Sequence, residues 1–355
     1  MENYEQKLFE YLERVARNNA SDLHLSAGSA PTLRVDGGLL PMQDEKILNP
    51  QDTEGMKDII LSDAHKKQLN DKKSVDLSYS YKNVARFRVN VYYQFGTVAL
   101  AFRFIPTKIR TIEELNLPRG IHQFTNYQQG LVLITGPAGH GKSTTLAALV
   151  DEINNKRSEH IITIEDPIEY IFTQERAMID QREVGRDTPD FRVALRDTFR
   201  QDPDIIVLGE MRDSETISTA ITAAETGHLI LATLHTNNAA QTIDRIIDSF
   251  PSGQQQQIRA QLALTLVGVV SQRLIPQVDG GRIPAIELLL ANAAIRNIIR
   301  EGKTYEINLV LETSVDEGMI SLNRYLSDLV KSGKISMEAA ESYSLNTKEF
   351  RALLK

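Results

Sequence analysis

The chain has 355 residues, of which 41% are hydrophobic and 25% are charged, as in an ordinary globular protein. This length exceeds what one hydrophobic core usually supports, so we expect two domains. The formal net charge of -7 gives no overall attraction to polyanions, and the lack of cysteine excludes disulfides and thiolate metal sites.

The amino-terminal residues, MENYEQKLFEYLERVARNN, mix acidic and basic side chains, which excludes a secretory signal. No uninterrupted apolar run reaches the length that spans a bilayer. We therefore expect a cytoplasmic protein that is at most peripheral to a membrane.

The first hundred residues are typical of a small α+β domain. Periodicity predicts helices over 8–15 and 56–69, and strands over 22–26, 33–35 and 84–104. In the last strand segment, Arg86 and Arg88 alternate with apolar residues, so both arginines lie on one polar face. Prolines interrupt the pattern after Ile105, and we place the domains at 1–105 and 118–355 with a linker over 106–117.

The second domain alternates strands and helices, which indicates an α/β fold with a mostly parallel sheet. Short apolar runs predict buried strands over 131–134, 161–164, 205–208 and 229–234. The tail after Phe250 has mainly helical character.

The clearest signal is a phosphate-binding loop between the strand at 131–134 and a following helix. Gly136 to Ser143 fits the pattern G-x-x-x-x-G-K-[ST], in which Lys142 reaches the β- and γ-phosphates of ATP and Ser143 binds Mg²⁺. The residues expected to contact the nucleotide are Gly136, Pro137, Ala138, Gly139, His140, Gly141, Lys142, Ser143 and Thr144.

Polar side chains follow three of the predicted strands, at the edge where parallel sheets bind ligands. They are Glu165, Glu210 and His235. Phosphoryl transfer to water needs a held Mg²⁺ and a base, which the two carboxylates can supply. His228 begins the strand that His235 ends, about 20 Å away in an extended strand, so only His235 is on the ligand side. For either histidine, an ordinary hydrogen-bonded role stays open.

Three arginines of the first domain, Arg86, Arg88 and Arg103, are candidates for charge stabilisation. Arginines on a strand face usually only contact solvent. However, the phosphate-binding domain has no obvious arginine finger, and a neighbouring subunit can supply one in trans. We therefore predict that these arginines complete a neighbour's site.

Several segments together resemble the secretion ATPase superfamily. GPAGHGKSTT (136–145), ITIEDPIEY (162–170), QREVGRDT (181–188), DPDIIVLGEMRD (202–213) and TAAETGHLILATLHT (222–236) look like its Walker A, aspartate box, Walker B and histidine box. ASDLHLSAG (20–28), IDRIIDSFP (243–251), QIRAQLA (257–263) and AIRNIIRE (294–301) make the chain most similar to the type IV pilus retraction ATPases.

This resemblance implies a homohexamer in which each subunit has a PAS-like amino-terminal domain and a RecA-like motor domain. It implies Mg-dependent ATP hydrolysis that drives pilus retraction and twitching motility on an inner-membrane platform protein at the pilus base. The acidic net charge and the lack of a recognisable nucleic-acid module indicate that no nucleic acid is a partner. The resemblance gives Lys142 and Ser143 the Walker A roles, and Glu165 a role at Mg²⁺, directly or through water. Glu210 then activates water, and His228 and His235 are the histidine-box pair.

The chain departs from the family pattern at His140, where a small residue such as serine is usual, and at Ile298, where leucine is usual. In AIRNIIRE, helical spacing predicts that Arg296 and Arg300 point outward. Spacing alone favours a solvated helix surface, but the resemblance implies that this segment serves retraction rather than ATP turnover. Three alternatives are a pilus assembly or type II secretion ATPase, a DNA-processing translocase, and a nucleotide-binding scaffold without turnover. The first group usually has a long amino-terminal extension and a four-cysteine insert, and we expect neither here.

Overall fold

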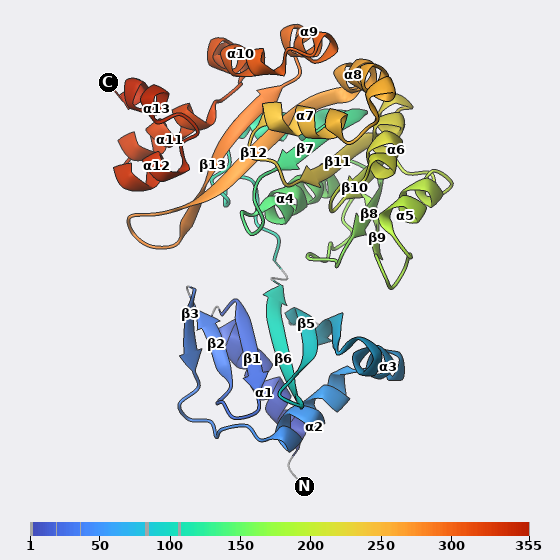
Figure 1. The fold of residues 1–355 in the computed structure, drawn as a ribbon, viewed down its shortest axis with the longest axis vertical. Coiled ribbons are helices and arrows are strands. Elements are labelled where there is room, and N and C mark those ends of the chain that lie inside the picture. The colour runs from blue at the N-terminus through green and yellow to red at the C-terminus, as the bar shows by residue number, and fades with distance from the viewer. Residues whose placement is uncertain (1–2, 19, 36, 82–84, 106–107, 355) are drawn as a thin grey trace. The chain divides into compact units, whose positions relative to one another are not determined.

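The computed structural model describes residues 3–18, 20–35, 37–81, 85–105 and 108–354. The chain divides into two compact units, one of residues 1–108 with 169–171 and one of residues 109–168 with 172–355 (Figure 1). Of the expected linker, residues 106 and 107 lie outside the described residues, and residues 109–117 belong to the second unit.

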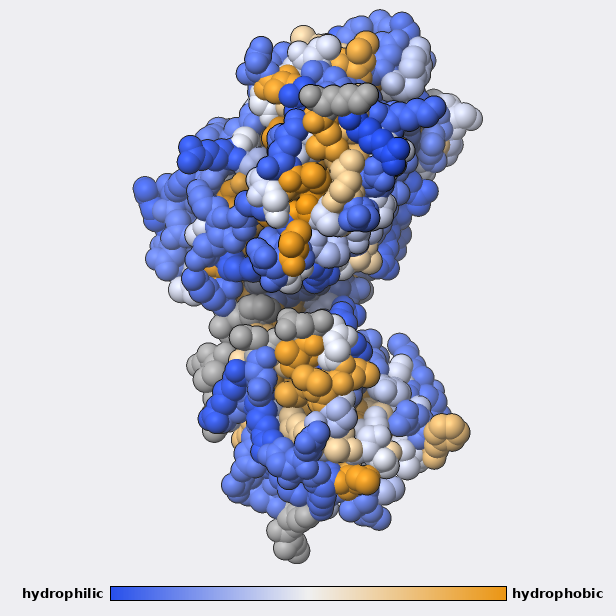
Figure 2. Space-filling view, turned by 90° about the vertical axis from the view of Figure 1, so that its left-hand side faces the viewer, coloured by the Kyte–Doolittle hydropathy of each residue, from blue (hydrophilic) through white to orange (hydrophobic). Residues whose placement is uncertain are grey.

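The surface of both units is mostly hydrophilic on the face that Figure 2 shows, with hydrophobic residues gathered in patches on each unit. Among large apolar side chains, Leu40 of the first unit and Tyr305 and Leu309 of the second are more than half exposed. No helix in the described parts of the chain is long and apolar enough to cross a membrane.

The first unit is an antiparallel sheet with helices, as the α+β prediction requires. Its strands are β1 (Asp22–Ser26), β2 (Thr32–Val35), β3 (Gly38–Pro41), β4 (Ser74–Tyr81), β5 (Ala85–Gln94) and β6 (Thr97–Ile105), in the order β3-β2-β1-β6-β5-β4. Its helices are α1 (Tyr4–Arg17), α2 (Pro50–Ile60) and α3 (Asp63–Lys72). Phe87 and Val89 of β5 are fully buried with Leu12 of α1, so the alternation seen in the sequence places the core face correctly.

The second unit is built on a seven-stranded sheet in the order β13-β12-β7-β11-β10-β8-β9. The strands are β7 (Gly130–Thr135), β8 (His160–Glu165), β9 (Met178–Glu183), β10 (Ile205–Leu208), β11 (Leu229–Leu234), β12 (Leu266–Pro276) and β13 (Arg282–Leu290). All neighbouring pairs are parallel except β12 with β13, which confirms the predicted α/β fold with a mostly parallel sheet.

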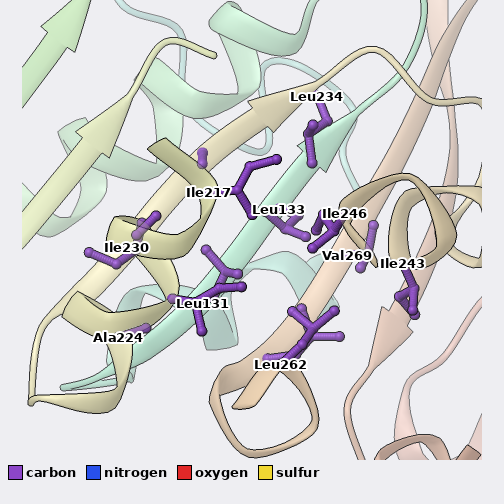
Figure 3. Close-up of a cluster of buried hydrophobic side chains, with 14 of the residues drawn as sticks. Leu131, Leu133, Ile217, Ala224, Ile230, Leu234, Ile243, Ile246, Leu262 and Val269 are labelled. Atoms are coloured by element: carbon purple, nitrogen blue, oxygen red, sulfur yellow. The ribbon is translucent and has the colours of Figure 1, made fainter. Parts of the chain in front are cut away.

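Helices cover both faces of this sheet, which is why its strands are apolar on both sides. The helices up to β12 are η1 (Arg119–Asn126), α4 (Lys142–Lys156), α5 (Phe191–Thr198), α6 (Ser214–Glu225), α7 (Ala239–Asp248) and α8 (Ser252–Thr265). Leu131 and Leu133 of β7 pack in one cluster with residues of α6, α7 and α8 (Figure 3). Val132 and Ile134 pack in a second cluster with residues of η1 and α4. The sheet is therefore fixed between two apolar layers.

The tail after Phe250 is helical over most of its length, as predicted, but it also contains the hairpin of β12 and β13. An apolar run buried on both faces does not distinguish a strand from a helix. The signal that identifies the hairpin is its turn, where Gly280 and Gly281 have φ values of 87° and 74°. The remaining elements are α9 (Ala293–Glu301), η2 (Thr304–Glu306), α10 (Ile307–Thr313), η3 (Val315–Glu317), α11 (Leu322–Lys331), α12 (Met337–Tyr343) and α13 (Thr347–Leu354).

The prediction that Arg296 points outward from α9 is wrong. Its guanidinium donates to the carbonyls of Ala263 and Leu264 near the C-terminal end of α8, at 2.7 and 2.6 Å, and to Ala291 at 2.9 Å. The last carbonyls of a helix have no partner within the helix, so a cation satisfies them well. Arg296 therefore joins α9 to α8, and only Arg300 remains as an exposed basic side chain.

Candidate functional site

The glycine-rich loop 136–141 connects the end of β7 to the first residue of α4. Gly136 has φ 145°, and a Cβ atom there would lie 2.3 Å from the carbonyl oxygen of Gln272. Gly141 has φ 82°, and a Cβ atom there would lie 2.9 Å from the Gln272 side chain. Both positions therefore need glycine, because the loop passes very close to β12 and adopts a backbone that other residues resist.

Lys142 is the first residue of α4 and is only 7% exposed. Its Nζ atom donates to the carbonyls of Gly136 and Pro137, at 2.9 and 3.0 Å, and to Nδ1 of His235 at 3.3 Å. The ammonium is thus held at the loop and next to the end of β11. Together with the N-terminal end of α4, it makes this place attractive to an anion.

Two further side chains extend this contact across the sheet edge. His235, directly after β11, has Nε2 3.5 Å from Oε2 of Glu210. Glu210, just after β10, pairs through Oε1 with Nη2 of Arg212 at 2.6 Å. The Glu210 side chain is 12% exposed, so this carboxylate is largely shielded from water. A lysine, a neutral base and a carboxylate therefore meet at the edge where a parallel sheet binds ligands.

The protonation state of His235 follows from its neighbours. Partial burial, and then the positive charge of Lys142, lower the pKa of His235 below its usual 6.5, although Glu210 acts in the opposite direction. The imidazole is therefore neutral at pH 7, with Nδ1 as the acceptor for Lys142. Nε2 then carries the proton and faces Glu210. A movement of Lys142 can therefore shift the imidazole and alter its contact with the Glu210 carboxylate.

Sequence reasoning missed Gln272 of β12, which is 2% exposed and ties the loop to the sheet. Its Nε2 donates to the carbonyl of His140 at 2.6 Å, and its Oε1 accepts from Thr145 of α4 at 2.7 Å. A polar residue within the apolar run 266–276 was the available signal, because a buried amide needs partners.

His140 makes a second connection to β12. Its Nδ1 accepts the backbone N–H of Leu274 at 2.9 Å, so the side chain faces the sheet. Burial, and then the positive charges of Arg273, Arg282 and Lys142, lower the pKa of His140. The unusual residue of the loop is therefore a neutral acceptor that fixes the loop's position.

Replacing His140 by alanine should lower the free energy of unfolding by about 1 kcal/mol near pH 7.5, because the Leu274 amide loses its acceptor. The lowered pKa means that this stabilisation is present above pH 6.5 and is lost as pH falls through the folded-state value. Guanidinium denaturation at about pH 7.5 and about pH 5.5 measures both effects. His140→Asn, which keeps a side-chain acceptor, is the control, and equal stability of wild type and His140→Ala at the higher pH would contradict this role.

A small cavity of about 100 Å³ adjoins the loop. Its lining includes Gly141, Thr144, Arg110, Asn116 and Arg282. The cavity lies beside the first turn of α4, and its lining by Arg110, Asn116 and Arg282 was not indicated by the sequence.

The other predicted carboxylate, Glu165, lies further from Lys142. It ends β8, and the strands β11 and β10 separate β8 from β7, which amounts to roughly 14 Å at the usual strand spacing. Glu165 accepts hydrogen bonds from Thr163 at 2.7 Å and Gln181 at 3.3 Å. Ser143, in the first turn of α4, is half-buried beside Lys142.

The structure does not bring His228 to the loop. His228 comes directly before β11 and His235 directly after it, so the two histidines lie at opposite ends of this strand. Nδ1 of His228 lies 3.0 Å from the carbonyl of Ala223. Its ring also packs edge-on against Phe199, with ring centroids 5.7 Å apart. Within one subunit, His228 thus stabilises the connection between α6 and β11.

The three arginines of the first unit share one face of its sheet. Arg88 of β5 pairs in register with Arg103 of β6, and Arg86 is two residues before Arg88 on the same face. Arg103 is 69% exposed and binds Asp22 at 3.1 Å, while Arg88 is 41% exposed and lies 3.9 Å from Asp76. This face therefore has a row of basic side chains, the basic row, in which Arg88 and Arg103 lie beside the acidic residues Asp76 and Asp22 of the same unit.

Comparison with known proteins assigns the family. The model of the family described as type II/IV secretion system protein matches residues 2–312. The chain belongs to this family. The match includes the loop, Glu165, Glu210 and both histidines, and it ends before α11.

Relatives within the type II/IV secretion system family match nearly the whole chain. The type IV pilus retractation ATPase PilT of Pseudomonas aeruginosa is 45% identical over 93% of this chain and 96% of its own. The twitching motility protein of Neisseria gonorrhoeae is 42% identical over 89% of this chain and 85% of its own. A crystal structure of the pilus retraction motor PilT with bound ADP has a TM-score of 0.91 at 45% identity, covering 97% of this chain and 98% of that one.

Proposed function

We propose that this family member is a motor that hydrolyses ATP to retract type IV pili. The contact of Lys142 with His235, and of His235 with Glu210, is the observation that carries the hydrolytic part. The direction of force is supported by relatives named for retraction and twitching that match nearly the whole chain. Type II secretion relatives are less similar: one protein E is 45% identical over only 42% of this chain, and the protein HxcR matches 92% of this chain but at 30% identity.

In the proposed reaction, the phosphates of ATP lie along the loop and the nucleoside lies in the cavity beside Arg110. Lys142 turns from the carbonyls of Gly136 and Pro137 to the transferring phosphoryl group and stabilises its charge. Glu210 accepts a proton from the attacking water. His235 contacts both Lys142 and Glu210. When Lys142 moves to the γ-phosphate, His235 loses this contact, and its contact with Glu210 changes in turn.

A magnesium ion is part of this proposal, and its ligands follow from the residues present. No cluster of three or more His, Cys, Asp or Glu side chains that suits a metal occurs among the described residues. Mg²⁺ typically takes one or two protein oxygens and completes its shell with phosphate oxygens and water. The Ser143 hydroxyl would fill that role, and Glu165, the more distant carboxylate, would contact the ion only through water. When bound, the ion neutralises phosphate charge.

We also propose that the chain works as a cytoplasmic homohexamer, peripheral to the inner membrane, on a platform protein of the pilus. The support for assembly is the basic row of the first unit, in which Arg88 pairs in register with Arg103. A neighbour's Arg86, Arg88 or Arg103 would add positive charge to the site.

Mixing two variants that are impaired for different reasons tests this arrangement. Arg88→Ala should lower ATP turnover by about tenfold or more, because a charge that stabilises the transition state is lost. Mixing it with Lys142→Ala should restore part of the activity, since some interfaces then combine an intact loop with an intact arginine. Arg34→Ala, on the same sheet face beside Asp22, is the matched control. A fully active monomer in sedimentation, or no recovery in the mixture, would contradict the arrangement.

Deletion of the gene tests the direction of force. Cells that are hyperpiliated and do not twitch indicate retraction, and cells without pili indicate assembly. Stimulation of the purified ATPase by DNA would instead favour a translocase.

A further inference from the structure

A cavity of about 660 Å³ opens in the second unit among α7, β13, α10, α11 and α13. None of the described loop residues 136–144 lines it, so it is separate from the nucleotide site. Its polar lining consists mainly of carboxylates and amides, and the described lining includes neither lysine nor arginine. These polar groups include Asn238, Gln241, Glu287, Glu312, Asn323 and Glu349.

Glu287 of β13 is the buried acid of this cavity, at 5% exposure. Its Oε1 accepts the N–H of Ala239, the first residue of α7, at 2.7 Å. Among the described residues, Oε1 is the oxygen of Glu287 that accepts a hydrogen bond, and Oε2 accepts none. Burial raises the pKa of Glu287 to about 7, with Arg273 acting against the rise and Glu312 and Glu349 adding to it. Apart from the Ala239 N–H, no hydrogen-bond donor of the described chain reaches this carboxylate, so its ionised form would gain from a further donor.

Two more carboxylates meet the same space. Oε1 of Glu312 is buried without a hydrogen-bond partner among the described residues, and its Oε2 is 3.8 Å from Nη2 of Arg324. Glu349 accepts one bond, from the Asn346 amide at 3.3 Å. The cavity therefore offers acceptor oxygens to a donor that carries positive charge.

The volume of the cavity and the separation of its carboxylate oxygens indicate what kind of cation fits. No three acidic or histidine side chains of the described chain cluster tightly enough to hold a metal ion. The cavity volume is instead in the range of pockets for small organic ligands, roughly 300–1,000 Å³. An elongated molecule with several N–H donors can reach more than one carboxylate at once.

We propose that this cavity binds an organic cation through ammonium or guanidinium groups, supplied either by a free polyamine or by a basic side chain of a partner protein. Glu287 links the cavity to the nucleotide site, because it holds the N–H of Ala239, and Ala239 follows His235 by only three intervening residues. A cation that binds Glu287 therefore acts on the segment that positions His235.

Calorimetric titration of spermidine into the purified full-length protein tests the site. We expect saturable binding that Glu312→Gln and Glu287→Gln each weaken by about tenfold or more. Glu338→Gln, an exposed acid on α12 outside the cavity, should bind as the wild type does. Because the cation favours ionised Glu287, affinity should rise as pH increases through about 7, with proton release on binding.

A short arginine-containing peptide, titrated in parallel, separates the two sources of the cation. Binding of spermidine alone identifies a polyamine site, and binding of the peptide identifies a site for a partner's side chain. Lack of binding by both probes, or equal affinity in wild type and Glu312→Gln, overturns the proposal. Glu312 is partly exposed, so its variant should fold even if Glu287→Gln does not. ATP turnover is measured on the same samples without added cation. Because binding is measured separately from turnover, failure of the cation proposal can be distinguished from failure of the proposed function.

Discussion

Replacing Lys142 by alanine should abolish ATP turnover, with kcat lower by on the order of a thousandfold or more. The Nζ atom is the one cation that the described structure holds directly against the loop carbonyls, at 2.9 and 3.0 Å. Its removal deletes a charge-assisted contact to the transferring phosphoryl group and also frees His235 from its donor. Release of phosphate by the purified protein measures the effect.

The control for this variant is Lys156→Ala on the same helix. Lys156 is 60% exposed and pairs with Glu152, so its loss should change turnover by no more than about twofold. Both proteins should show cooperative unfolding before their kinetics are compared. If Lys142→Ala retains near wild-type kcat, the loop is not the site of phosphoryl transfer.

Glu210→Gln should separate binding from hydrolysis. The amide keeps the shape of the carboxylate between Arg212 and His235, but it cannot accept the proton of the attacking water. We expect ATP to bind with similar affinity while turnover falls by about 10²- to 10⁴-fold. Fluorescent nucleotide titration and single-turnover kinetics measure the two quantities.

An exposed acid nearby provides the comparison. Glu215, at the start of α6, is 66% exposed and pairs with Arg192, so Glu215→Gln should turn over ATP normally. Unchanged turnover in Glu210→Gln would move the role of base to Glu165. In that event Glu165→Gln should be the variant that binds ATP without hydrolysing it.

The phosphate loop could be predicted because local rules alone specify it. Gly136 and Gly141 adopt backbone angles that favour glycine, and the apolar spacing of Leu146 and Leu149 marks the buried face of α4. The convergence of Glu210 and His235 also followed from sequence, since both end parallel strands. Strand order was not available, however, so the larger separation of Glu165 from β7 appears only in the fold.

Residues far along the chain were harder to predict, because their roles depend on tertiary pairing. Gln272 reaches the loop only because β12 lies beside β7, and nothing local to 266–276 indicates that neighbour. Arg296 has the spacing of a surface residue but contacts the carbonyls of another helix. Glu287 similarly lies in an apolar strand, and only the fold shows the N–H group that it holds.

The amide of Gln272 has a mechanical consequence. By joining the carbonyl of His140 to the hydroxyl of Thr145, it makes the loop, α4 and β12 a single stiff body. The next residue of the strand, Arg273, donates to the carbonyl of Tyr343 at the end of α12. Two adjacent residues of β12 therefore connect the loop to the carboxyl-terminal helices, so the shortest bonded route from the loop to α12 runs through Gln272 and Arg273.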